Sequence, residues 1–506
     1  MKIVRAVDRL SMYRFVLIAL AILAAYAIIV AASGADFAYT ATELLGSLAI
    51  LVVVCAAVTY LCAAIVRVPP GSESWLITAL ILFFIFPGLT DTDSAWGLVL
   101  AAAIASASKY VVAVRRRHIV NPAVAGAVVS YLFAYFSVGP FLYPVWWIAA
   151  EPLMVAMIVV GAAVVWKLRE WWLVGVFLAV AVLTMIVVAA DNGTPVGDAL
   201  QLGFQSTPLL FVAAIMLTEP LTSPTSRIPT LVYAALVAVL MYWNQSFEIT
   251  SEYTLEFVPE IALLAGSLFT FVVGRQWRRH ILEVESVQPI GTDTYEVLAS
   301  PGLRFRPGQW AQISDPTWSP APEKQGTRRV LSLAGAPGEG TTRFGFTVSG
   351  RPSEFKRRLI EDGAGRRLFV DEVGGDFTLP RNLRSPMVFI AGGIGITPFR
   401  SMLADLTARG DTDLTQVSLI YAANSEDRLV YGDVLDAARA RGAQVITVVG
   451  GLVSVDDVAA VARPGAHYYL SGPPMMLSAL KPMLIRAEPA LRWQPWRLHT
   501  DRFIGY

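Results

Sequence analysis

The sequence predicts a multi-domain chain in which a ten-span α-helical membrane domain precedes a small antiparallel β-barrel and a doubly wound α/β domain. Three observations carry this prediction. First, residues 14–274 consist of apolar runs, each long enough to cross a bilayer, which takes roughly 20 apolar residues. Second, short alternating segments separated by Gly and Pro turns follow from residue 281. Third, buried strands alternate with helical segments from residue 387 onward, which is typical of a parallel sheet.

Composition supports a division of the chain into unlike halves. The hydrophobic fraction of 55% and the charged fraction of 16% are averages over both halves. A basic cluster at residues 275–280 marks the boundary, and we expect domains at 1–275, 281–383 and 384–506. The net charge of +1 argues against nucleic acid as a partner. The two cysteines, Cys55 and Cys62, are too few to hold an iron–sulfur cluster.

Charge in the connecting segments predicts the topology of the membrane domain. The candidate spans are centred near residues 23, 55, 82, 101, 130, 155, 181, 208, 236 and 265. Connections that contain Lys or Arg alternate with connections that contain neither, and the positive-inside rule places the basic set in the cytoplasm. We therefore expect a multi-pass protein of the inner cell membrane, with its N-terminus and its C-terminal half in the cytoplasm. The basic N-terminal head leads into a run too long for a cleaved signal peptide.

Few ionisable side chains fall within the predicted spans. Glu151 is expected inside the sixth span and Glu260 inside the tenth, where a carboxylate is costly and marks either a functional site or a locally satisfied group. His118 is the one histidine near a span, so the chain lacks the stacked histidines that a membrane haem pair needs.

The most informative residues for function form two glycine-rich segments in the α/β domain. Residues 389–398 read Phe-Ile-Ala-Gly-Gly-Ile-Gly-Ile-Thr-Pro, and residues 469–476 read Tyr-Leu-Ser-Gly-Pro-Pro-Met-Met. The first is typical of a buried strand that turns through glycines into a helix, where backbone N–H groups can meet a phosphate. The second is typical of a buried strand that ends at a tight loop. Together the two segments predict a nicotinamide-nucleotide site.

Three further segments precede this pair. They are Arg329-Val330-Leu331-Ser332, Gly350-Arg351-Pro352-Ser353 and Gly375-Asp376-Phe377-Thr378-Leu379-Pro380. Because these segments and the glycine pair occur in this order, residues 281–506 resemble the ferredoxin–NADP+ reductase superfamily, in its flavin reductase and NADH oxidoreductase branches. The resemblance implies that Arg329 meets the flavin pyrophosphate, that position 331 stacks on the flavin, and that Ser332 approaches flavin N5. Because Leu331 replaces the aromatic residue of the family, we expect Trp496, Phe503 or Tyr506 to supply the stacking.

The resemblance also implies FAD and NAD(P)H as cofactors and no metal site. Ser332 and Ser471 are the catalytic candidates, and Ser471 stands where the family has a cysteine beside the nicotinamide. The cofactor-binding candidates are Arg329, Val330, Leu331, Ser332, Gly350, Ser353, Gly392, Gly393, Gly395, Thr397, Pro398, Gly472, Pro473 and Tyr506. The choice between NAD and NADP stays open, because Ser425 and Arg428 fit either a 2′-phosphate site or a solvated loop.

Two polar segments interrupt the apolar runs at their cytoplasmic ends. Residues 117–126 read Arg-His-Ile-Val-Asn-Pro-Ala-Val-Ala-Gly, and residues 217–224 read Leu-Thr-Glu-Pro-Leu-Thr-Ser-Pro. Such breaks occur where they line a site, although helix caps followed by Pro explain much of the pattern. Both segments resemble the His-x-x-Asn-Pro-Ala and Thr-Asp-Pro-x-Thr-Ser segments of one family. That family comprises the B subunit of the Na+-translocating NADH:quinone oxidoreductase and the D subunit of the Rnf complex.

The membrane resemblance implies a flavin in this domain, often an FMN esterified to Thr in a Ser/Thr-Gly-Ala-Thr segment. The chain lacks that segment, so a non-covalent FMN, another flavin or a quinone is the open alternative. The sequence therefore predicts a membrane-bound, FAD-dependent NAD(P)H oxidoreductase that passes electrons to a quinone or a trans-membrane acceptor, such as a periplasmic one. The rival hypotheses are a membrane-anchored reductase for a soluble partner and a redox-driven Na+ or H+ pump.

Overall fold

The computed structural model divides the chain into two compact units, Met1–Trp277 and Arg278–Tyr506. We call them the membrane unit and the reductase unit after the sequence predictions above. The described residues are 12–34, 37–66, 73–114, 117–168, 170–219, 222–224, 227–243, 246–250, 253–256, 258–273, 280–315, 328–348, 350, 352–380, 382–409 and 414–502.

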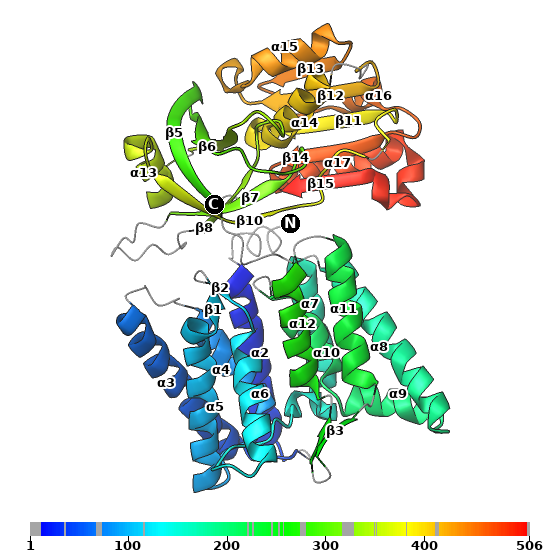
Figure 1. Ribbon diagram of the computed structural model, residues 1–506. Helices are drawn as coiled ribbons and strands as arrows, with labels where there is room; N and C mark the ends of the chain where they lie inside the picture. The colour runs from blue at the N-terminus through cyan, green and yellow to red at the C-terminus, as the bar shows by residue number, and fades with distance from the viewer. Residues whose placement is uncertain are drawn as a thin grey trace. The chain divides into compact units, whose positions relative to one another are not determined.

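Helices of the membrane unit lie side by side as a bundle (Figure 1). They are α2 (Met12–Ala32), α3 (Ala41–Val66), α4 (Ser74–Ile85), α5 (Thr92–Val111), α6 (Pro122–Tyr135), α7 (Met154–Leu168), α8 (Trp171–Asp191), α9 (Val196–Gln205), α10 (Leu209–Phe211), α11 (Arg227–Tyr242) and α12 (Pro259–Val273). Short turns η1 (Trp147–Ala149) and η2 (Glu151–Leu153) precede α7, and a π-helical turn, η3 (Val212–Met216), extends α10. Two small hairpins complete the unit, β1 (Ala113–Val114) with β2 (Arg117–His118), and β3 (Ser246–Thr250) with β4 (Tyr253–Glu256).

Five of the described helices are long and apolar enough to cross a membrane, and a sixth span results if α9 and the α10–η3 helix, bent by 61°, count as one. Nine of the ten predicted span centres fall in apolar helices, and residue 208 falls at that bend. Four of these helices are shorter than a full span, so the count of ten stays a prediction. The apolar helix that corresponds to the sixth predicted span runs from Glu151 to Leu168, so Glu151 lies at its first residue and not several residues inside it. Glu151 is exposed in η2 before α7, because Pro152 follows it and starts the turn.

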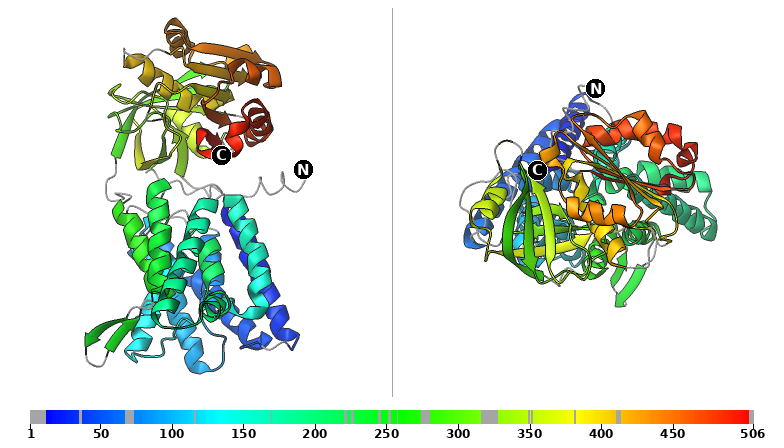
Figure 2. Two further views of the ribbon diagram at one scale, coloured as in Figure 1. Left: turned by 90° about the vertical axis from the view of Figure 1, so that its right-hand side faces the viewer. Right: turned by 90° about the horizontal axis from the view of Figure 1, so that it is seen from above.

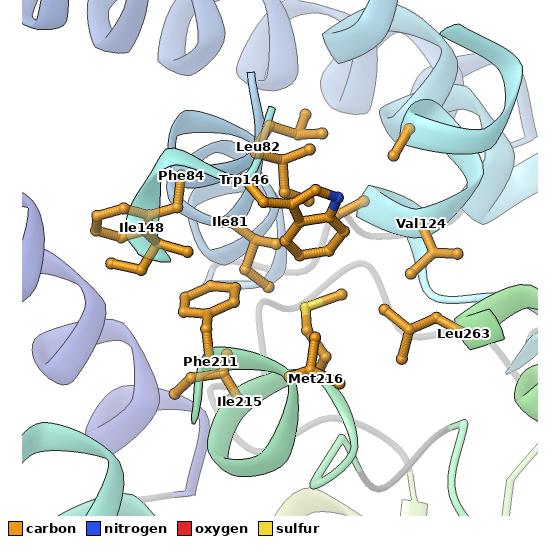
Figure 3. Packing of buried hydrophobic residues seen from close by; sticks show 14 of the residues in the cluster. Ile81, Leu82, Phe84, Val124, Trp146, Ile148, Phe211, Ile215, Met216 and Leu263 are labelled. Carbon is orange, nitrogen blue, oxygen red and sulfur yellow. The ribbon is translucent and has the colours of Figure 1, made fainter. Parts of the chain in front are cut away.

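Large apolar side chains from several helices fill the centre of the membrane unit (Figure 3). The Trp146 ring lies among residues of α4, α6, η3 and α12 in this view. The indole Nε1 of the neighbouring Trp147 donates to the carbonyl oxygens of Phe83 (2.6 Å) and Phe86 (2.8 Å). These bonds occupy carbonyls at the end of α4, where an unpaired buried oxygen would be costly. The loop between α6 and α7 is thereby held inside the bundle.

The reductase unit begins with a six-stranded antiparallel sheet. Its strands are β5 (His280–Gly291), β6 (Thr294–Ser300), β7 (Trp310–Ser314), β8 (Arg328–Ser332), β9 (Thr342–Thr347) and β10 (Arg367–Gly374), in the order β8-β7-β10-β5-β6-β9. A single bridge, Leu333 to Phe344, joins the two ends of this order, so the sheet curls on itself. Alternate residues such as Leu282, Val284 and Val297 point into one core, which α13 (Glu354–Asp362) covers. The antiparallel sheet is as predicted, whereas a barrel closed along its full length stays a prediction.

A five-stranded parallel sheet follows, and it confirms the predicted α/β arrangement. Its strands are β11 (Met387–Gly392), β12 (Val417–Ala423), β13 (Gln444–Val449), β14 (His467–Gly472) and β15 (Leu498–Arg502), in the order β13-β12-β11-β14-β15. Neighbouring residues Val388 and Phe389 belong to different apolar clusters, because successive side chains leave opposite faces of a strand.

Helices cover both faces of the parallel sheet (Figure 2). Residues of α14 (Thr397–Ala408) and α15 (Gly432–Ala440) belong to one apolar cluster, and residues of α16 (Val455–Val461) and α17 (Pro474–Ala487) belong to the other. Short turns η4 (Gly393–Ile396), η5 (Glu426–Arg428), η6 (Pro489–Arg492) and η7 (Pro495–Arg497) complete this part. Strand β15 was not predicted, because its charged and polar residues interrupt the apolar pattern of a buried strand.

Candidate functional site

The two glycine segments meet at the centre of the parallel sheet. Strand β11 pairs with β14, and Ala391 lies opposite Ser471 in their register. A Cβ at Gly395 would lie 2.3 Å from the Ser471 carbonyl oxygen, and a Cβ at Gly392 would lie 2.5 Å from Met476 Sδ. The first contact is with backbone, so glycine at position 395 is required for the turn after β11 to lie against the end of β14. Segments about seventy residues apart in sequence form one loop pair at the switch point of the sheet, where such folds bind nucleotides.

The turn after β11 presents backbone donors at the start of α14. Gly393 has φ of +55°, and a Cβ there would meet no atom within 4 Å, so this part of the turn is open. Thr397 and Pro398 begin α14, and the Thr397 hydroxyl donates to the Ile394 carbonyl at 2.7 Å. The first N–H groups of a helix have no partner within the helix and favour an anion. Gly393, Gly395, Thr397 and Pro398 thus form a geometry suited to a pyrophosphate.

Asp501 brings the two catalytic candidates together. Ser471, at the end of β14, lies opposite Asp501 of β15, and its Oγ donates to Asp501 Oδ2 at 3.5 Å. The Asp501 carboxylate also interacts with the Ser332 hydroxyl at the end of β8. Burial raises the pKa of Asp501 to about 6, although the hydrogen bonds from both serines oppose the shift. Sequence reasoning missed Asp501, whose only signal is a carboxylate within a short alternating segment.

Two basic side chains lie close together near the N-terminus of α13. Arg329 is 2% exposed, with its guanidinium 5.5 Å from the centre of the Phe355 ring. Lys356 donates to the Thr347 carbonyl at 2.9 Å, and its pKa is lowered by burial and by the charge of Arg329. An anionic group would relieve this repulsion between like charges. The site therefore fits the pyrophosphate of a dinucleotide such as FAD.

Other candidate residues surround this basic pair. Gly350 has φ of +70°, which glycine adopts without strain, and the Ser353 hydroxyl caps α13 by accepting from the Lys356 N–H. Val330 and Leu331 lie in β8, and Leu331 packs against the core of the antiparallel sheet. Gly472 ends β14, and Pro473 precedes α17.

Of the three residues expected to stack on the flavin, the structure describes one. Trp496 lies in η7 with 58% of its side chain exposed. Phe503 and Tyr506 lie outside the described residues. On the nucleotide loop, Arg428 forms an ion pair with Asp293, so its side chain is engaged with the antiparallel sheet.

The two polar segments of the membrane unit converge on Glu219. Its Oε1 is 3.2 Å from His118 Nε2, and its Oε2 accepts from the Asn121 amide and from the Thr222 hydroxyl. Asn121 also caps α6, where its Oδ1 accepts from the Ala123 N–H at 2.9 Å. The two polar segments are therefore joined by a single carboxylate. This polar cluster ties the start of α6 to the end of η3.

Comparison with known proteins finds similarity in the reductase unit. Residues 389–459 match the family described as Oxidoreductase NAD-binding domain. Over 227 residues, the chain is 27% identical to the reductase component of propane 2-monooxygenase from Rhodococcus jostii, covering 40% of this chain and 58% of that protein. Over 147 residues, it is 36% identical to ferredoxin–NADP reductase B from Sorangium cellulosum, covering 28% and 55%.

A third relative is the ferredoxin reductase component of 3-ketosteroid-9-alpha-monooxygenase from Mycolicibacterium smegmatis, 30% identical over 210 residues and covering 38% of this chain and 54% of that protein. Each match thus spans little more than half of the relative. Among solved structures, the flavohem-like FAD/NAD binding domain of nitric oxide dioxygenase from Vibrio cholerae aligns with 20% identity and a TM-score of 0.37, covering 44% of this chain and 98% of that one. The C-terminal half is therefore similar to ferredoxin–NADP+ reductase-type proteins, and this similarity supports an FAD-dependent NAD(P)H oxidoreductase.

We expect Gly395→Ala to destabilise the reductase unit and to raise the KM for NADH. The added methyl would collide with the Ser471 carbonyl and push the two loops apart. Overpacking of this kind costs about 1–3 kcal/mol, which unfolding in denaturant would detect. Gly432→Ala is the matched control, because a Cβ at Gly432 meets no atom within 4 Å. Equal stability of both variants would contradict the close approach.

Asp501→Asn should change how stability depends on pH. Burial holds the pKa of Asp501 at about 6, above its value of about 3.9 in an unfolded chain. The folded state therefore binds this proton more tightly, and its contribution to stability is complete below pH ~4 and lost as pH rises through about 6. The unfolding free energy of the wild type minus that of the variant should fall between these pH values. A difference that does not change with pH would contradict the raised pKa.

Glu219→Ala should lower the thermal unfolding temperature of the full chain in detergent. The change leaves the His118 ring, the Asn121 amide and the Thr222 hydroxyl without their shared acceptor. Each buried polar group without a partner costs about 1–3 kcal/mol. Glu73→Ala is the control, because it removes an ion pair with the exposed Arg14, and surface pairs contribute about 0–1 kcal/mol. Equal effects of the two variants would show that the cluster does not hold the unit together.

Proposed function

We propose that the full chain is a membrane-bound, FAD-dependent NAD(P)H oxidoreductase that passes electrons through its membrane unit to a quinone or a trans-membrane acceptor. One observation carries this proposal. The Gly395 turn lies against Ser471, and the hydroxyls of Ser471 and Ser332, from two different strands, both interact with Asp501. Glycine loops that suit a dinucleotide thereby lie beside hydroxyls that suit the reacting rings.

Each group in the site has a role in this proposal. A flavin, when bound, would accept a hydride and release its electrons one at a time. Arg329 and Lys356 bind its pyrophosphate by charge. The turn from Gly393 to Thr397 binds the phosphates of NAD(P)H through backbone N–H groups. The Asp501 carboxylate orients the Ser332 and Ser471 hydroxyls and can hold a proton at Oδ2, because its pKa of about 6 lies close to neutral pH.

Apolar helices in the same chain support a membrane acceptor. Five described helices meet the length and composition of a membrane span. The connections that lack Lys and Arg favour an arrangement in which the reductase unit faces the cytoplasm, at the inner membrane. The resemblance of the converging His118 and Glu219 segments to quinone-linked membrane subunits favours a quinone or a second, non-covalent flavin.

A membrane-anchored reductase for a soluble partner is the second candidate. The observation that favours it is the nature of the relatives, two of which are reductase components of monooxygenases. In that case, the helices would serve as an anchor, and the acceptor would be a protein.

The test is the cofactor content and activity of the purified full-length chain. We expect bound flavin that is bleached by NADH or NADPH, together with reduction of ferricyanide, which takes electrons directly from flavin. Reoxidation by a short-chain quinone would favour the membrane acceptor, and reoxidation only by a soluble protein would favour the second candidate. More than one flavin per chain would place a second one in the membrane unit. A chain that retains no flavin and oxidises neither nucleotide would refute the proposal.

A further inference from the structure

A cavity of about 390 Å³ lies in the membrane unit between the end of α6, the loop before η1 and the start of α12. Its volume is in the range of small-molecule sites, which run from roughly 300 to 1,000 Å³. The side chains that matter here are those of Tyr131, Tyr135, Tyr143, Trp146 and Glu260. The cavity thus combines four aromatic rings with one carboxylate.

Three of the rings that line this cavity lie at different angles to one another. Tyr131 and Tyr135, one helical turn apart on α6, lie with ring centres 6.1 Å apart and planes inclined by 26°. Tyr131 and Tyr143 are also 6.1 Å apart but meet edge to face, at 74°. Rings at an angle to each other form the walls of an aromatic cage, whose electron-rich faces attract cations.

Glu260 supplies the charge of the cavity. Its side chain is 1% exposed, and its Oε2 accepts a hydrogen bond from Trp146 Nε1 at 2.9 Å. Figure 3 shows that the Trp146 ring is wedged among apolar side chains of the core, which fixes this donor. The residue has φ of +47°, unusual for an aromatic residue, and its backbone N–H donates to the Ile85 carbonyl at 2.9 Å. The tryptophan is therefore held in place to contact the carboxylate.

The chain offers this carboxylate no positive partner. Among the described residues that line the cavity, Glu260 is the one charged side chain. It forms no ion pair with any residue that the structure describes. The flanking segments 138–144 and 243–254 contain no Lys or Arg in the sequence. Because a buried carboxylate is costly unless it is paired, an external cation would stabilise the charged form of Glu260.

We propose that this cavity binds an organic ammonium group, supplied either by the headgroup of an aminophospholipid or by a soluble amine. Glu260 pairs with the positive charge, and the rings of Tyr131, Tyr135 and Tyr143 surround its carbon atoms. An anionic ligand such as a nucleotide phosphate is disfavoured, because the cavity offers it a carboxylate and no cation among the described lining residues. This site is independent of the proposed oxidoreductase activity, since it uses none of the residues of the reductase unit.

The test is binding of choline and ethanolamine to the full-length chain in detergent free of aminophospholipid, by titration calorimetry. Glu260→Gln keeps the shape of the side chain and its contact with Trp146 but removes the charge, so we expect affinity to fall about tenfold or more. Tyr143→Leu, at a ring with 48% exposure, should also weaken binding without unfolding the chain. Glu151→Gln is the control, because Glu151 is exposed and does not line the cavity.

Nanodiscs with and without phosphatidylethanolamine distinguish the sources of the ammonium group. Release of tightly bound phosphatidylethanolamine by Glu260→Gln, with no binding of free amines, assigns the site to lipid; binding of free amines in micelles assigns it to soluble ligands. The proposal is overturned if an uncharged alcohol of the same shape as choline binds equally well. It is also overturned if neither source binds, or if folded Glu260→Gln and Tyr143→Leu variants bind like the wild type. NADH–ferricyanide activity should be unchanged throughout, so its absence in the wild type would count against the proposed function alone.

Discussion

The candidate reductase site depends on one close approach, that of the turn after β11 to the end of β14. These strands are adjacent in the sheet. From β11 the strand order continues outward to β12 on one side, and from β14 it continues to β15 on the other side, so the strand order reverses between β11 and β14. A turn with side chains could not lie against the Ser471 carbonyl at the distance found for Gly395. This approach places backbone donors and a serine hydroxyl at one edge of the sheet. The antiparallel sheet then adds Ser332 through Asp501.

Contacts between the two sheets of the reductase unit preserve this arrangement. Arg400 of α14 donates to the Ala334 carbonyl at 2.9 Å and to Glu339 at 3.0 Å, and Ser401 donates to the Gly335 carbonyl at 2.6 Å. These donors belong to the helix that begins at the glycine turn, and their acceptors lie in the loop between β8 and β9. The helix that carries the dinucleotide turn is therefore attached to the strand end that carries Ser332. Local motion of one sheet against the other would break several buried hydrogen bonds together.

Two carboxylates of the membrane unit, Glu219 and Glu260, have different surroundings. Glu219 accepts hydrogen bonds from three side chains, so the polar cluster at the break between helices is internally satisfied. Glu260 has a neutral donor, Trp146, and lines an aromatic cavity. The first arrangement is that of a structural clamp, and the second is that of a site for a ligand. A buried carboxylate thus serves a structural role where the chain supplies its partners, and it is a candidate binding group where the chain does not.

The sequence by itself determined that apolar helices form the first half and that an antiparallel and a parallel sheet form the second. Period-two alternation and apolar runs predicted β5, β6 and β7 of the antiparallel sheet and β11 to β14 of the parallel sheet, because burial on one or both faces of a strand shows in the residue order. The glycine segments and Arg329-Val330-Leu331-Ser332 predicted the dinucleotide chemistry, since local turns depend on local residues. Only the tertiary structure joined Ser332 and Ser471 through Asp501, and the His118 segment to Glu219. It also gathered Tyr131, Trp146 and Glu260 around one cavity. These groups are far apart in the chain, and their proximity depends on strand order and helix packing, which no local pattern specifies.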